Sequence, residues 1–225
     1  MCLSHDSDTL TERQPNFLFS FIFAFASLLI IQISIFFTFI YNLIIFPFTV
    51  VHELSHCFAL YCFFPGKKAQ IEFHLLDNGI IGASVKFEHL PICLGSVISL
   101  LIGPFSILIL AILCSIILRK YPSSDFKSAG NQFLKFVLLC EIPNLFPIHP
   151  PMINAITDGY AASVFLFQMG YIPFVSTELS VFFYSIAAII SFAAFFFLGK
   201  TVYFLLYHFK LSILKENQGF QPQFS

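Results

Sequence analysis

The sequence predicts an all-α polytopic membrane protein of about six transmembrane helices, with a small β-hairpin insert. Of its 225 residues, 58% are hydrophobic and only 10% are charged, whereas soluble domains carry about a quarter charged residues. No Asp, Glu, Lys or Arg occurs between Arg13 and Glu53, or between Glu88 and Arg119. A bilayer core of about 30 Å needs roughly 20 apolar residues per helix. These two gaps alone therefore demand several spans.

The first apolar run begins near Phe17 and continues to residue 63. As one helix this run would be about 70 Å long at 1.5 Å per residue, so we expect the chain to fold back around Ile40–Asn42. The six expected spans are 17–38, 42–63, 94–118 (interrupted by Gly103-Pro104), 131–146, 156–173 and 179–207. They leave no room for a separate soluble domain. We therefore expect one membrane-embedded domain over 1–225, with its core at 42–173.

The only sizeable polar insert, residues 68–88, follows the second span and has the pattern of a β-hairpin. Apolar and polar residues alternate on both sides of Asn78-Gly79, and Asn-Gly strongly favours a tight type I′ turn. Two interpretations stay open. The hairpin is a loop packed on the membrane surface, or its edge strand pairs with an extended peptide.

The distribution of basic residues predicts an orientation in the membrane. With six spans, one side holds six basic residues and the other side holds three. The six are Arg13, Lys67, Lys68, Lys86, Lys210 and Lys215. The three are Arg119, Lys120 and Lys127. The positive-inside rule then places both termini and the hairpin in the cytoplasm, in a multi-pass protein of the cell (inner) membrane. A net charge of −1 argues against nucleic acid as a partner and leaves the lipid bilayer as the expected surroundings.

The sharpest motif is His52-Glu53-Leu54-Ser55-His56, an HExxH sequence within the second span. Residues four apart share one face of a helix, so two imidazoles can bind one zinc ion while the adjacent Glu reaches the metal-bound water. An ionisable residue inside an apolar helix is costly unless it pairs or performs a function. The alternative is a buried polar cluster that only joins neighbouring helices.

A catalytic zinc site needs a third protein ligand and keeps one position for water. Asp158 is the favoured candidate, because a carboxylate at the start of a membrane helix is costly without a cation, and Gly159 lets neighbouring backbone approach. Its alternative role is an N-terminal helix cap. Glu141 is the rival ligand, or else a protonated buried acid without a metal. His74 and His149 are further candidates in loops.

These motifs resemble the site-2 protease family of intramembrane zinc metalloproteases. The resemblance rests on the HELSH sequence in a span, on Asn144-Leu145-Phe146-Pro147 and on Thr157-Asp158-Gly159, with Gly103-Pro104 in an intervening span. It covers about 110 residues. Ser55 stands where the family usually has Gly, and the segment between the last two motifs is longer than in the tightest family pattern.

The resemblance implies a single metalloprotease domain that binds one zinc ion per chain through His52, His56 and Asp158. It implies that Glu53 is the catalytic glutamate, that Asn144 contacts the substrate backbone, and that the substrate is a membrane-spanning or membrane-associated protein or peptide. Glu-assisted attack by zinc-bound water would hydrolyse its peptide bonds. Two alternatives stay open: a catalytically inactive relative that binds membrane proteins, and a metal or proton transporter.

Overall fold

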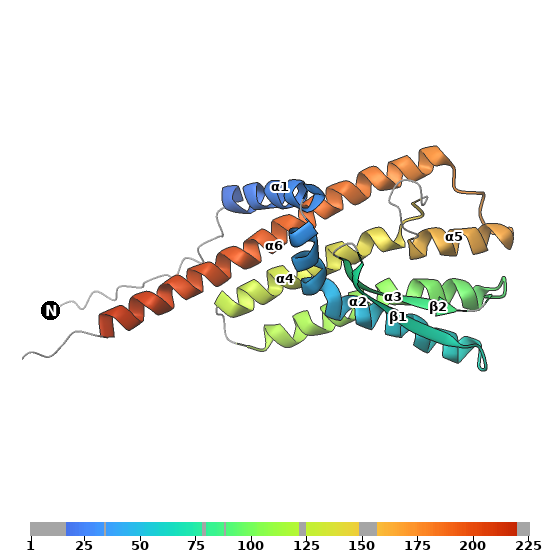
Figure 1. Ribbon diagram of the computed structural model, residues 1–225, viewed down its shortest axis with the longest axis horizontal. Coiled ribbons are helices and arrows are strands. Elements are labelled where there is room, and N and C mark those ends of the chain that lie inside the picture. The colour runs from blue at the N-terminus through green and yellow to red at the C-terminus, as the bar shows by residue number, and fades with distance from the viewer. Residues whose placement is uncertain are drawn as a thin grey trace, which may run out of the picture.

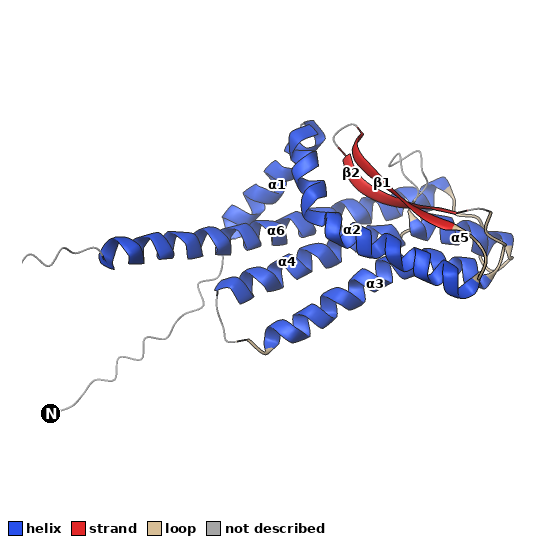
Figure 2. Ribbon diagram, turned by 60° about the horizontal axis from the view of Figure 1, so that its bottom comes forward, coloured by secondary structure: helices blue, strands red, loops and turns tan. Residues whose placement is uncertain are grey.

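The computed structural model describes residues 17–33, 35–77, 80–87, 89–121, 125–148 and 157–219. Within them the chain forms helices and one two-stranded sheet (Figures 1 and 2). The elements in chain order are α1 (Phe17–Ile33), α2 (Ile35–Phe63), β1 (Ala69–Asp77), β2 (Ile80–Phe87), α3 (Leu94–Arg119), α4 (Asp125–Glu141), the 3₁₀ turn η1 (Ile142–Leu145), α5 (Asp158–Gln168) and α6 (Thr177–Gly219).

Three of the described helices are long and apolar enough to cross a membrane: Phe39–Phe63 within α2, Leu94–Arg119 and Thr177–Lys210 within α6. A shorter apolar helix covers Phe17–Ile31. Their outer faces are covered with exposed Phe, Leu and Ile side chains, as expected where lipid replaces water. The sequence predicted about six spans, and three of the described helices have the length and composition of a span.

The predicted fold-back at Ile40–Asn42 is wrong, because α2 continues through these residues from Ile35. Tyr41 explains the continuity: its ring packs on Phe136 of α4, with centroids 6.3 Å apart, and on Phe195 of α6 at 5.5 Å. These contacts hold the start of α2 against the bundle. The helix also contains Pro47, which removes one backbone donor from its ladder.

The predicted spans 131–146 and 156–173 are two short helices in series. Figure 1 shows α4 and α5 following one another along one line. The 17-residue α4 contains Lys127 and Lys135, and α5 has only 11 residues. Neither is a long apolar helix, because the polar motifs that build the site occupy the ends where the two meet.

This arrangement changes the predicted orientation. The helices α4 and α6 pack side by side, and the ring of Phe126 lies 4.4 Å from that of His208. Lys210 therefore lies near the α3–α4 connection, at the end of the bundle opposite the hairpin. The start of α1 packs on the same helix, with Phe17 against Phe196 and Phe19 against Tyr203. The described residues thus separate Lys210 and the start of α1 from the hairpin, whereas the predicted orientation grouped the hairpin with both termini.

The hairpin itself is confirmed. Strands β1 and β2 pair antiparallel, with Ile71 opposite Val85 and Phe73 opposite Ala83, and β2 lies against α2. The predicted Asn78-Gly79 turn lies outside the described residues.

One buried cluster holds the centre of the bundle together: Ile107 of α3, Phe136 and Val137 of α4 and Ala194 of α6 are all at most 2% exposed. Residues of α2, including Val51, pack around it. The helix that carries the HExxH motif is thereby fixed between α3 and α4.

Candidate metal centre

His52 and His56 lie one turn apart on the inner face of α2 and are 6% and 5% exposed. Both rings turn their Nε2 atoms toward Asp158 at the start of α5. The Nε2 of His52 is 2.9 Å from Asp158 Oδ2, and that of His56 is 3.5 Å from Oδ1. One ligand atom from each of the three residues lies within 4.8 Å of the others. The three side chains thus form a compact group that could hold a metal ion.

The local backbone explains why Asp158 points into this group. Thr157 is the N-cap of α5: its Oγ1 accepts a hydrogen bond from the backbone N–H of Tyr160 at 3.1 Å and donates one to the carbonyl of Phe146 at 2.6 Å. Asp158 therefore does not serve as the cap, and its carboxylate is free to meet the imidazoles. A Cβ on Gly159 would collide with the carbonyl of Leu145, so only glycine allows α5 to start so close to η1.

Each imidazole has a second partner on its other side. The Nδ1 of His52 lies 3.1 Å from Oε2 of Glu141, which is itself buried. The Nδ1 of His56 lies 2.6 Å from the backbone carbonyl of Ser99 in α3. Metal-bound histidines usually donate their outer ring N–H to a carboxylate or a carbonyl, which fixes the tautomer and leaves the other nitrogen for the metal. The two rings are thus oriented as metal ligands would be.

This geometry separates the two carboxylates that the sequence left as rivals. Asp158 lies on the inner side, where both Nε2 atoms converge, and Glu141 lies on the outer side of His52. Asn144 donates a hydrogen bond from Nδ2 to Glu141 Oε2 at 3.1 Å, so it steadies the outer carboxylate. A role for Asn144 at the substrate backbone stays a prediction.

Gly103 of α3 packs directly against the two rings. A Cβ built at this position would lie 2.5 Å from His56 Nε2 and 2.6 Å from His52 Nε2, far inside van der Waals contact. The helix runs through Gly103 and Pro104 without a break, so the predicted interruption is wrong. The Gly-Pro pair instead lets α3 approach the imidazoles.

Glu53 lies on the flank of α2 next to the two histidines and is half-buried. Its carboxylate interacts electrostatically with both imidazoles, with Asp158 and with the backbone of Val85 in β2. The β-hairpin thus reaches the HExxH motif, and its edge strand lies beside the residue expected to act as a base.

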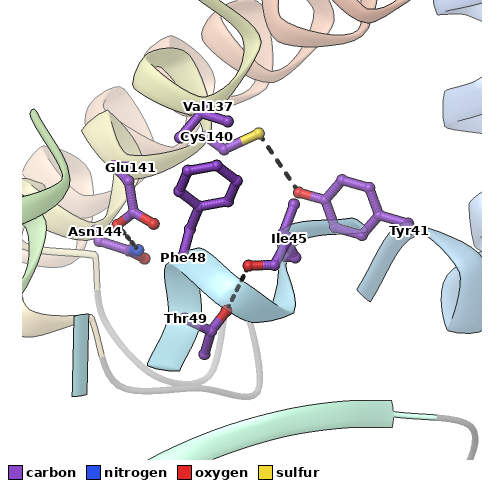
Figure 3. Close-up of a pocket in the computed structure, with 8 residues that line it drawn as sticks. All are labelled: Tyr41, Ile45, Phe48, Thr49, Val137, Cys140, Glu141 and Asn144. Atoms are coloured by element: carbon purple, nitrogen blue, oxygen red, sulfur yellow. Dashed lines mark hydrogen bonds between the residues drawn. The ribbon is translucent and has the colours of Figure 1, made fainter. Parts of the chain in front are cut away.

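A cavity of about 210 Å³ opens between α2 and α4 beside Glu141 and Asn144 (Figure 3). Its wall is mixed: the Tyr41 hydroxyl lies 3.6 Å from Cys140 Sγ, and the Thr49 hydroxyl bonds to the carbonyl of Ile45. The eight lining residues are Tyr41, Ile45, Phe48, Thr49, Val137, Cys140, Glu141 and Asn144. The side chain of Asn144 therefore lines this cavity and also hydrogen-bonds to Glu141.

The structure brings together the predicted residues His52, Glu53, His56 and Asp158, although Asp158 is more than 100 positions from the other three in the chain. His149 and the side chain of His74 lie outside what the structure describes. Sequence reasoning missed Ser99, whose carbonyl carries no signature in the sequence, and it noted Gly103 only as a helix interruption. The spacing of Gly103 from the motif gave no sign that it touches the rings.

No protein-family model, curated protein or solved structure matches the chain significantly.

Proposed function

We propose that this chain is an intramembrane zinc metalloendopeptidase that hydrolyses peptide bonds of membrane-spanning or membrane-associated proteins. The observation that carries the proposal is the convergence of both Nε2 atoms and the Asp158 carboxylate beside Glu53, with an acceptor behind each histidine. A polar cluster that merely joined helices would need neither the converging nitrogens nor a glycine pressed against them. The resemblance of the motifs to site-2 proteases points the same way.

The donor set fits zinc, which binds imidazole nitrogen and carboxylate oxygen and keeps a position for water in catalytic sites. In the proposed centre His52, His56 and Asp158 are the ligands, and Glu141 and Ser99 orient the two rings from outside. Zinc at this position would acidify a bound water molecule and polarise a peptide carbonyl.

The chain's own residues carry out the remaining steps of the proposed reaction. Glu53 accepts the proton of the attacking water and returns it to the nitrogen of the departing amine, so the same carboxylate acts first as base and then as acid. The backbone of Val85 in β2 lies near the Glu53 carboxylate and interacts with its charge. Asp158 keeps its charge opposite the imidazoles, and the buried surroundings strengthen these interactions.

The substrate must present an extended backbone, because a membrane helix satisfies its own amides and has to unwind before attack. The edge of β2 beside Glu53 supports a role in holding the unwound segment by strand pairing. Asn144, at the cavity between α2 and α4, is the proposed polar contact for the substrate backbone on the other side.

The decisive experiment is Glu53→Gln, assayed with a purified membrane-spanning reporter. Gln keeps the size of Glu but cannot take a proton, and loss of a positioned base costs about 10²–10⁴ in rate. The variant should insert, fold and bind zinc like the wild type while cleavage falls by that factor. A chelator should stop wild-type cleavage, and added zinc should restore it.

Wild-type rates from a folded Glu53→Gln protein would overturn the proposal. A wild type that binds zinc, cleaves none of a panel of membrane-spanning reporters and instead carries ions across vesicles would favour the transporter.

A further inference from the structure

A second group of charges lies between α4 and α6, where the charge-free run of α6 ends. Lys135 of α4 and Lys200 of α6 approach the same aromatic ring: their Nζ atoms are 5.2 and 5.6 Å from the centroid of Phe197. Lys200 also lies 4.9 Å from the ring of Phe196. Lys135 is exposed and Lys200 is half-buried, so both ammonium groups can be reached from outside the protein.

Neither lysine has an acidic partner within the described residues. The ion pairs found there involve the histidine cluster and the hairpin pair Lys86–Glu72. The two ammonium groups repel each other across the ring, and cation–π contacts compensate only part of the lost hydration. Among the described residues, the two like charges therefore lie together without an anion beside them.

The sequence of α6 places this pair at a membrane boundary. Between Glu178 and Lys200 the helix has 21 consecutive residues without a charge, which span about 30 Å at 1.5 Å per residue and match the hydrocarbon core of a bilayer. Lys200 ends this run. Lys135 lies at the same level, because it shares Phe197 with Lys200.

Buried polar groups also lie on the two helices that carry the pair. Gln132 lies one turn before Lys135 on α4, and its buried Oε1 atom finds no hydrogen-bond partner within the described residues. On the facing helix, Thr201 bonds to the carbonyls of Phe197 and Ala129, which fixes α6 against α4 at this level. The two lysines are thus carried by helices that are held together, with an unsatisfied acceptor beside them.

We propose that Lys135 and Lys200 bind the phosphate of an anionic phospholipid, with its acyl chains along exposed apolar side chains of α6 such as Phe182 and Ile189. Two unneutralised cations at the depth of the headgroups, held between two helices, complement a phosphodiester charge, and basic pockets between membrane helices recognise anionic headgroups in this way. This site is separate from the metal centre.

Native mass spectrometry of the full chain in detergent tests the proposal, with dioleoyl-phosphatidylglycerol titrated against dioleoyl-phosphatidylcholine. The wild type should prefer the anionic lipid. Each of Lys135→Gln and Lys200→Gln should weaken its binding about fivefold, and the double variant about 25-fold. Lys135→Arg/Lys200→Arg should keep it, because Arg preserves both the charge and the ring contact. Zinc content, measured in parallel, should not change.

The matched control is Lys67→Gln/Lys68→Gln, which removes the same two charges at the hairpin end. An equal loss of lipid binding in this control would show an effect of net charge alone and overturn the site. Equal binding of the two lipids by the wild type would overturn it as well. Displacement of the lipid by low-millimolar inorganic phosphate would replace the lipid site with a site for a free anion. If the double Gln variant does not fold, the single variants decide.

Discussion

The bundle holds two groups of ionisable side chains, the metal centre and the Lys135–Lys200 pair, by different kinds of contact. Around the metal centre, every imidazole nitrogen faces a specific oxygen at 2.6–3.5 Å, and the groups come from α2, α3, α4 and α5. In the second group, Lys135 and Lys200 make cation–π contacts with phenyl rings about 5 Å away and form no ion pair with an acidic residue among the described residues.

Under the two proposals, this difference separates a reaction centre from a lipid-binding surface. Directional contacts fix the position of a ring to fractions of an ångström, which metal binding and catalysis require. Ring contacts fix neither distance nor angle closely, and so they suit a mobile ligand such as a phospholipid headgroup. The first arrangement should respond sharply to single substitutions, and the second should respond gradually.

The largest expected effect comes from His56→Ala. It removes a direct ligand, so zinc affinity should fall by more than about 100-fold, the upper range for loss of an outer partner. Lys200→Gln removes a positive charge from the Lys135–Lys200 pair and should leave about one zinc ion bound per chain. Metal analysis of both proteins in detergent, with competition by a chelator, measures the contrast. Equal zinc loss in the two variants would show that zinc binding does not depend on the histidine group in particular.

A smaller effect is expected for Gly103→Ala, because its methyl group would sit 2.5 Å from His56 Nε2 and must push the rings apart. Overpacking of this kind costs about 1–3 kcal/mol, so the melting temperature and the zinc affinity should both fall. Gly130→Ala is the control: its methyl would lie 3.3 Å from a flexible Leu118 side chain. If Gly103→Ala behaves like this control, then α3 does not press on the imidazoles.

The smallest effect is expected for Val85→Pro, which deletes a backbone amide of β2 near Glu53. A single backbone hydrogen bond is worth about 1 kcal/mol, so cleavage of the reporter should fall about fivefold while zinc is retained. Val85→Ala keeps the amide and serves as the control. Equal rates for the Pro and Ala variants would remove β2 from the account of the site.

The sequence predicted those features that depend on local periodicity. The HExxH helix ends at Phe63, the third span lies within Leu94–Arg119, and the hairpin strands alternate as expected, because composition and spacing alone determine them. The fold-back at Ile40–Asn42 could not be located in this way. Those residues stay helical through the contacts of Tyr41 with distant aromatic rings, which no local pattern encodes.

The same limit applies to the site. The sequence identified His52, His56, Asp158 and Glu141, but it could not say which carboxylate lies on the Nε2 side of the histidines. That answer depends on how α4 and α5 meet at η1, where Thr157 bonds to Phe146. The end of the bundle that α6 reaches could also not be predicted from local sequence patterns. It depends on α4 and α5 following one another along one line, whereas the sequence predicted two separate spans.

The central claim is that Asp158 is the inner carboxylate of a metal centre and Glu141 the outer one, and zinc binding by Asp158→Ala and Glu141→Ala tests it most directly. Both proteins are purified in detergent, loaded with zinc and titrated with a chelator. Asp158→Ala should lose the metal. Glu141→Ala should still hold about one zinc per chain at saturation, with affinity reduced about 10–100-fold, as for other outer partners of a metal-bound histidine. Full zinc binding by Asp158→Ala together with zinc loss in Glu141→Ala would contradict the account.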